Sequence, residues 1–205
     1  MIIIVTGTPG TGKTTFARKL SSELNCETIS TSRLAVELGL VERDPTGRAT
    51  HVLLPGAGGR LARHICDIDR TVGCLIVETT YADLLLEDEC INSGTVLIVL
   101  LRAHPSILLD RLARRGWPPG KVLENVEAEL ANAVGASLSA YADETVEVDT
   151  SLSTPSDTVD MMFYKLEVWD WNTGIRIDWT RDSEALETVS RLSLSIDLDQ
   201  YRLPL

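Results

Sequence analysis

Residues 2–14 read IIIVTGTPGTGKT, a β-branched run followed by a glycine-rich turn. The run Ile2–Val5 is continuous, as is typical of a central parallel strand that is buried on both faces. The turn Gly7–Thr14 matches the pattern G-x-x-x-x-G-K-[ST], in which glycines let backbone N–H groups converge on phosphate oxygens. Average residue usage produces such a match in a chain of this length with a probability of roughly one per cent. The stretch therefore predicts a phosphate-binding loop between a strand and a helix.

Three polar side chains are candidates for chemistry at this loop. Lys13 is placed to bring a positive charge to the β- and γ-phosphates of ATP, and the Thr14 hydroxyl is placed to bind Mg²⁺. Glu78 ends the apolar run Leu75–Val77, and ligands of open α/β sheets bind at the carboxyl ends of the strands. We therefore predict Glu78 as a second magnesium ligand; the alternative is an ordinary solvated acid at a strand end.

Arginines gather before the break Gly116–Gly120. Arg111, Arg114 and Arg115 lie within five residues of one another, and Arg102 ends the strand before them. Arg111 and Arg115 are four residues apart and share a helix face. Such a cluster either balances the negative end of a helix dipole or belongs to a mobile lid that brings arginine onto a nucleotide. We expect the lid, with the arginines stabilising charge during phosphoryl transfer.

Strand and helix patterns alternate along the chain, which predicts one α/β domain with three α/β/α layers and a parallel central sheet. The stretch Val41–Gly59, which is rich in proline and glycine, is expected to be a mobile loop. The expected strands are Ile2–Val5, Glu27–Ile29, Cys74–Val77, Thr95–Leu101 and Thr145–Val148. The expected helices are Thr14–Leu24, Ser32–Leu38, Arg60–Ile68, Tyr81–Glu89, 105–115, 122–141 and Pro155–Lys165.

The composition excludes several classes of protein. A net charge of −11 argues against non-specific binding to nucleic acid, which depends on Lys and Arg neutralising phosphates. No apolar run reaches the length of about eighteen residues that a membrane helix needs, and the start of the chain carries no basic leader. We therefore expect a soluble, cytoplasmic protein without a membrane partner.

The four cysteines, Cys26, Cys66, Cys74 and Cys90, are scattered and form no C-x-x-C pair. In a chain without a secretory signal this spacing predicts reduced, mostly buried thiols rather than a disulfide framework. The three histidines are also dispersed, so no structural zinc site is expected.

Four segments together resemble the CINAP-type adenylate kinase isoenzyme-six family, a short-lid branch of the nucleoside-monophosphate kinases. They are GTPGTGKTT at residues 7–15, Leu75–Glu78, RLARRGWPPGKVLENVEAEL at 111–130 and VDTSLSTP at 148–155. The resemblance covers roughly residues 1–165. It implies a P-loop fold of the nucleoside-monophosphate-kinase type, with a monophosphate-binding segment at about residues 30–53 and a short lid at about 114–124.

The resemblance also implies roles for particular residues. Ser30 and Thr31 would receive AMP, and Arg115 would be the lid arginine that touches ATP. The expected phosphate contacts are Gly10, Gly12, Lys13, Thr14 and Thr15. The chain departs from the family pattern at Thr80, where a histidine is usual, and this puts intrinsic ATP hydrolysis in doubt. It also lacks a basic residue within Ser151–Thr154, where the family often has one near the base.

Residues 166–205 have no counterpart in this family pattern, and we expect them to pack on the core. They contain Trp169, Trp171 and Trp179, a short strand expected at Ile175–Trp179 and a helix near Ser183–Leu192. The alternative is that the aromatic residues form a docking surface for a partner. Trp117 is equally open to two interpretations, stacking on adenine or anchoring the lid.

The leading hypothesis is an enzyme that uses ATP and Mg²⁺ to phosphorylate a nucleoside monophosphate, with AMP preferred and Lys13, Arg111 and Arg115 as the catalytic residues. The alternative that the resemblance implies is an ATP-driven assembly factor for late maturation of the small ribosomal subunit, including pre-rRNA processing, with a platform ribosomal protein as partner. A third interpretation, a small-metabolite kinase such as a shikimate or gluconate kinase, fits the phosphate-binding loop but not the lid segment.

Overall fold

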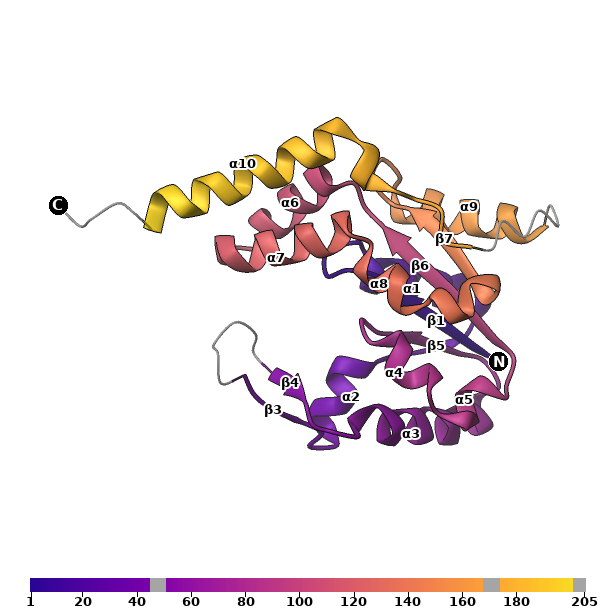
Figure 1. Ribbon diagram of the computed structural model, residues 1–205. Coiled ribbons are helices and arrows are strands. Elements are labelled where there is room, and N and C mark those ends of the chain that lie inside the picture. The colour runs from indigo at the N-terminus through magenta and orange to yellow at the C-terminus, as the bar shows by residue number, and fades with distance from the viewer. Residues whose placement is uncertain (45–50, 168–173, 201–205) are drawn as a thin grey trace.

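A computed structural model describes residues 1–44, 51–167 and 174–200 (Figure 1). Five strands form one parallel sheet in the order β2-β5-β1-β6-β7. This confirms the predicted parallel α/β architecture. The strands are β1 (Ile2–Thr6), β2 (Glu27–Ser30), β5 (Leu75–Glu78), β6 (Val96–Arg102) and β7 (Thr145–Asp149).

Helices cover both faces of the sheet, because the strands are apolar on both sides. On one face, Ile3 and Val5 pack with α1 and α9. On the other face, Ile2 and Ile4 pack with the helices that precede and follow β5. The helices are α1 (Lys13–Leu24), α2 (Thr31–Glu37), α3 (Ala57–Val72), α4 (Ala82–Leu86), α5 (Glu89–Asn92), α6 (Pro105–Arg114), α7 (Pro119–Leu130), α8 (Ala133–Ser137), α9 (Pro155–Glu167) and α10 (Ser183–Gln200), with 3₁₀ turns η1 (Ser139–Glu144) and η2 (Trp179–Arg181).

The prediction of a loop over residues 41–59 was wrong at both of its ends. Strands β3 (Val41–Arg43) and β4 (His51–Leu53) pair antiparallel as a small separate hairpin, and residues 45–50 lie outside the described part. Helix α3 already begins at Ala57. Gly58 is needed there, because a Cβ at this position would lie 2.8 Å from the carbonyl oxygen of Leu84. The glycine thus marks a close helix contact, although its sequence signal is that of a loop.

Two predicted helices are each broken into shorter ones. The stretch 122–141 divides because Asn132 adopts the left-handed conformation (φ 53°), which ends α7 and starts α8. The stretch 81–89 stops at Leu86, and α5 begins anew where the Asp88 side chain accepts a hydrogen bond from the Cys90 backbone N–H.

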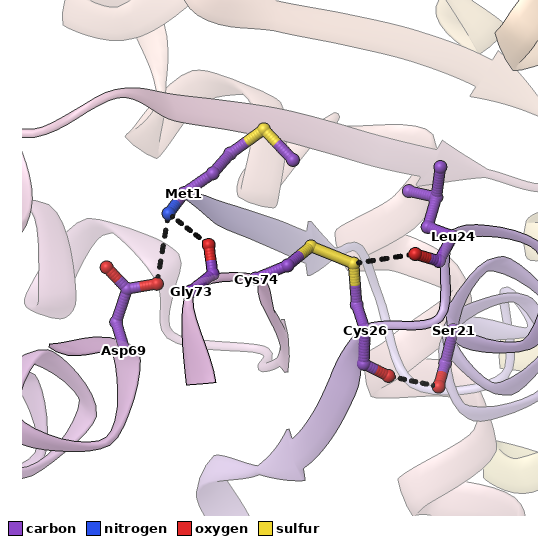
Figure 2. The surroundings of a disulfide bond; sticks show 7 residues. All are labelled: Met1, Ser21, Leu24, Cys26, Asp69, Gly73 and Cys74. Carbon is purple, nitrogen blue, oxygen red and sulfur yellow. Dashed lines mark hydrogen bonds and ion pairs between the residues drawn. A yellow bond between two sulfur atoms is a disulfide. The ribbon is translucent and has the colours of Figure 1, made fainter. Parts of the chain in front are cut away.

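The cysteines form two disulfides, so the prediction of reduced thiols was wrong. Cys26 pairs with Cys74, and Cys66 pairs with Cys90. Cys26 and Cys74 each precede a strand, and the register that pairs Glu27 with Leu75 brings them side by side (Figure 2). Their Cα atoms are 5.0 Å apart, within the range that a disulfide spans. The sequence hides this pairing, because 48 residues separate the two cysteines.

The C-terminal helix α10 packs along α6 and α7 (Figure 1). The expected helix is confirmed and is longer than predicted, whereas the strand expected at Ile175–Trp179 is absent from this part of the described chain. The backbone N–H groups of Arg176 and Ile177 donate instead to the Glu147 carboxylate. Trp169 and Trp171 lie outside the described residues. In the ranges that the structure describes, every helix is too short or too polar to cross a bilayer.

Candidate functional site

The P-loop connects β1 to α1 at the carboxyl edge of the sheet, as its sequence predicts. Gly7 and Gly10 have φ values of 140° and 101°, in the range that favours glycine. Both are also closely packed. A Cβ on Gly7 would lie 2.3 Å from the Leu101 carbonyl oxygen, and a Cβ on Gly10 would lie 2.6 Å from Leu108 Cδ1. The loop therefore needs glycine both for its backbone turn and for its fit against β6 and α6.

Lys13 begins α1, and its ammonium group folds back onto the loop. Its Nζ donates to the carbonyl oxygens of Gly7 at 2.7 Å and Thr8 at 3.2 Å. Burial lowers the pKa of Lys13 to about 8, while the carboxylates of Glu78 and Glu129 oppose this shift. The side chain is therefore a cation at neutral pH that is held in the loop and carries little hydration.

Thr14 and Glu78 meet beside Lys13. The Thr14 hydroxyl donates to Glu78 Oε1 at 2.5 Å. Glu78 ends β5 and is paired with Val5 of β1 and Ser30 of β2, so it stands next to the P-loop at the same sheet edge. A hydroxyl and a carboxylate are hard oxygen donors that suit Mg²⁺. The described residues contain no group of three or more His, Cys, Asp or Glu that could hold a metal by itself.

A cavity of about 220 Å³ lies on the α6 side of the P-loop and gathers several of the predicted residues. Arg111 lines it and donates to the carbonyl oxygen of Thr150 at 2.6 Å and to the Thr150 hydroxyl at 3.1 Å. Burial lowers the pKa of Arg111, and the guanidinium stays charged. Thr150 in turn donates to the Thr11 carbonyl oxygen at 2.9 Å, so the arginine is tied to the P-loop. The residues lining the cavity are Gly10, Thr11, Gly12, Thr15, Phe16, Arg111, Arg115, Thr150, Ser153, Pro155 and Thr158.

The segment predicted as the lid, residues 114–124, consists of the exposed turn between α6 and α7 and the first part of α7. Arg115 lies at the end of α6 and lines the cavity, whereas Arg114 forms an exposed ion pair with Asp110 at 2.8 Å. Trp117 is half-buried against α6 and α7, with Lys121 Nζ 4.3 Å from its ring centroid. It does not line the 220 Å³ cavity. The geometry favours the anchoring interpretation of Trp117 over stacking on adenine.

Arg102 is not available to a nucleotide, contrary to the expectation that it adds positive charge to the site. Its side chain is 1% exposed and pairs with Glu129 and Glu147, each at 2.8 Å. A guanidinium this deeply buried requires such partners. The sequence did not show this, because the three residues come from β6, α7 and β7.

A second cavity, of about 430 Å³, lies on the other side of the P-loop, between α2, the β3–β4 hairpin and α3. Thr31 lines it, and its hydroxyl donates to the Thr79 hydroxyl at 3.0 Å. Ser30 ends β2 as the N-cap residue of α2 and is not among the lining residues. Sequence reasoning missed Arg33 and Tyr81, which line the cavity. Arg33 carried a signal that could have been used, since it is a cation within the predicted monophosphate segment.

Comparisons with known proteins show which proteins this chain resembles. A family model described as "AAA domain" matches residues 3–132. A protein of Pyrococcus furiosus named "Putative adenylate kinase" is 31% identical over 198 residues, which cover 94% of this chain and 98% of the relative. A protein of the same name from Saccharolobus solfataricus is 36% identical over 152 residues, covering 74% of this chain and 75% of the relative.

Solved structures extend the likeness to the fold. Shikimate kinase from Acinetobacter baumannii, in complex with shikimate, superposes with a TM-score of 0.55 at 13% identity. The match covers 82% of this chain and 93% of the kinase. At this identity the likeness concerns the fold alone.

Proposed function

The chain belongs to the P-loop kinase family of its relatives in Pyrococcus and Saccharolobus, and we propose that it transfers the terminal phosphoryl group of ATP to a nucleoside monophosphate, with AMP as the preferred acceptor. One observation carries the proposal. Two cavities flank a single P-loop, one lined by Arg111 and Arg115 and the other by α2 and the hairpin. The strand order puts β1, and hence the loop, between them. This arrangement suits two nucleotides whose phosphates meet at the loop.

The larger cavity has the character of an acceptor site. It has an apolar wall that includes Leu53 and Leu84, with Arg33 and Thr31 among its polar residues. Nucleotide sites combine an apolar wall for a base with a few placed polar groups, and a guanidinium matches a phosphate. Arg33 is therefore assigned to the monophosphate of the acceptor, and Thr31 and Ser30 to its surroundings.

In the proposed reaction, the residues bind and orient the two phosphate groups. The P-loop N–H groups and Lys13 hold the phosphates of ATP, while Arg115 stabilises the charge of the transferring group from the lid side. Arg111 holds the loop after β7 against the P-loop and shapes the ATP cavity. Thr14 and Glu78 would hold Mg²⁺ together with the bound nucleotide, and the ion would supply positive charge to the phosphates. Closure of the lid turn would exclude water from the acceptor.

The test is a direct turnover assay. The purified protein is mixed with ATP, Mg²⁺ and each nucleoside monophosphate in turn, and diphosphate formation is followed. Rapid formation of ADP with AMP, faster than with the other monophosphates, is the expected result. Slow ATP hydrolysis that no monophosphate accelerates would reject the proposal and favour an ATP-driven assembly factor, the alternative that involves a ribosomal partner.

A further inference from the structure

A buried hydrogen-bond network joins the P-loop to the helix that follows the lid turn. The Thr8 hydroxyl donates to Glu129 Oε2 at 2.5 Å, and Glu129, on α7, is 2% exposed. Its other oxygen, Oε1, accepts from Arg102 Nε at 2.8 Å and from the Ala103 backbone N–H at 3.0 Å. Arg102 also donates to the Glu129 carbonyl oxygen at 3.0 Å. Both the side chain and the backbone of Glu129 are therefore fixed.

Thr8, which Glu129 holds in place, is in turn hydrogen-bonded to Lys13 of the P-loop. Its carbonyl oxygen accepts from Lys13 Nζ at 3.2 Å, from the Thr11 backbone N–H at 3.2 Å and from the Thr11 hydroxyl at 2.9 Å. The side chain of Thr8 is thus held by α7, while its carbonyl holds Lys13 and Thr11. A displacement of Glu129 would move the peptide group to which Lys13 is bound.

Helix α7 is itself tied to the lid. It begins at Pro119, directly after the lid turn, and packs against α6, which ends beside Arg115. We propose that Glu129 is a positioning residue that fixes the P-loop through Thr8 and couples its geometry to the docking of α7. The proposal rests on the proposed function only in requiring that ATP binds at the P-loop; it holds for any phosphoryl acceptor.

The first test changes Thr8 alone. Thr8→Val keeps the shape of the side chain and removes its donated hydrogen bond, and Thr8→Ser restores a hydroxyl. Calorimetry with Mg²⁺ and a non-hydrolysable ATP analogue should show Thr8→Val binding about tenfold more weakly than the parent, with Thr8→Ser close to the parent. In turnover, KM for ATP should rise while KM for the monophosphate stays within about twofold.

The second test changes Glu129 and compares it with a neighbour on the same helix. Glu129→Gln removes the charge that fixes Thr8 and Arg102, whereas Glu127→Gln removes an exposed carboxylate two residues away. Glu129→Gln should weaken ATP binding, and Glu127→Gln should not. Thr8 and Glu129 act through one contact. A double variant with Thr8→Val and Glu129→Gln should therefore bind the ATP analogue little more weakly than the single variant that has the lower affinity.

Thermal unfolding separates this role from a purely structural one. Thr8→Val leaves Oε2 of the buried Glu129 without this donor, so its melting temperature should fall. ATP binding measured well below that temperature, where the variant is folded, should still be weaker than in the parent, whereas a purely structural role would leave it unchanged. The proposal would be overturned if Thr8→Val bound ATP as tightly as the parent. It would also be overturned if the loss of affinity in the double variant equalled the product of the losses in Thr8→Val and Glu129→Gln. The calorimetric measurement of ATP binding contains no nucleoside monophosphate, so its result does not depend on the proposed acceptor. A parent protein that binds the ATP analogue but phosphorylates no monophosphate would reject the proposed function and leave the positioning role to be decided by the Thr8 variants.

Discussion

Lys13 is a buried ammonium group whose nearest hydrogen-bond acceptors are two carbonyl oxygens of its own loop. Burial is the main cause of its lowered pKa of about 8, compared with 10.5 for an ordinary lysine. Phosphate binding requires the protonated form. Half of the Lys13 side chains are neutral at about pH 8, so we expect the affinity for Mg²⁺ and ATP to be about halved between pH 7 and 8, and to fall by up to about tenfold per pH unit at higher pH. Calorimetry at pH 7, 8 and 9 measures this slope.

The matched control is Lys13→Ala, which has no ammonium group to titrate. It should bind ATP weakly at every pH, show no such slope and lose phosphoryl transfer by at least about a hundredfold, with its fold intact by circular dichroism. Retained turnover in Lys13→Ala would remove Lys13 from the site. A parent affinity that does not change between pH 7 and 9 would contradict the lowered pKa.

At the scale of elements, the end of α6 offers a pair of arginines for comparison. Arg115 lines the 220 Å³ cavity beside the P-loop, and Arg114, next to it, is paired with Asp110 on the surface. Both side chains are exposed, so neither substitution should change the melting temperature by more than about 2 °C. Arg115→Ala should lower kcat by a factor of about 10²–10³, whereas Arg114→Ala should leave it within about twofold. Equal rates for the two variants would remove the lid role.

Each disulfide joins two elements that are otherwise held together by strand pairing or by helix packing. Cys26–Cys74 joins the starts of β2 and β5, and Cys66–Cys90 joins α3 to α5. They close loops with sequence separations of 48 and 24, so each should stabilise the fold by about 2–4 kcal/mol. Urea unfolding with and without a reductant measures the sum.

Two double variants separate the contributions of the two disulfides to stability. One carries Cys26→Ser and Cys74→Ser, and the other carries Cys66→Ser and Cys90→Ser. Each double variant should respond to the reductant about half as strongly as the parent. An unfolding midpoint that the reductant does not shift in the parent would show that the bridges contribute nothing to stability.

The sequence predicted the elements whose signals are local. The apolar runs predicted all five strands of the central sheet, and the helix expected from Thr14 begins one residue earlier, at Lys13. The pairs that depend on the sheet register were missed, as Cys26–Cys74 illustrates. The prediction of a loop at Gly58 was wrong for a related reason. This glycine allows a close helix contact with Leu84, which only the tertiary structure reveals.

At the scale of the whole molecule, the C-terminal region is part of the structure around the site. Arg102 and Glu147 hold the backbone of Ile177, and His104 of the α6 N-terminus packs edge-on against Trp179 with ring centroids 5.1 Å apart. These contacts join segments that are far apart in the sequence, so local patterns could not predict them. They bring α10 across α6 and α7 (Figure 1), the two helices that flank the lid turn.

Two leucines on α10 test whether this packing stabilises the molecule. Leu192 is half-buried against the core of α6 and α7, whereas Leu194, two residues later, is 62% exposed. Leu192→Ala should lower the free energy of unfolding by about 1–2 kcal/mol, because it removes apolar contacts from a partly buried position. Leu194→Ala should change it by less than about 0.5 kcal/mol. Urea unfolding of the two variants and the parent gives both values.

The same pair of variants shows whether α10 also supports the lid. If α10 holds α6 and α7 in place, Leu192→Ala should raise KM for ATP in step with its loss of stability, and Leu194→Ala should not. Parent-like stability in Leu192→Ala would contradict the packing of α10 on these helices. A loss of stability with an unchanged KM would confine α10 to a structural role, because the lid would then be set by α6 and α7 alone.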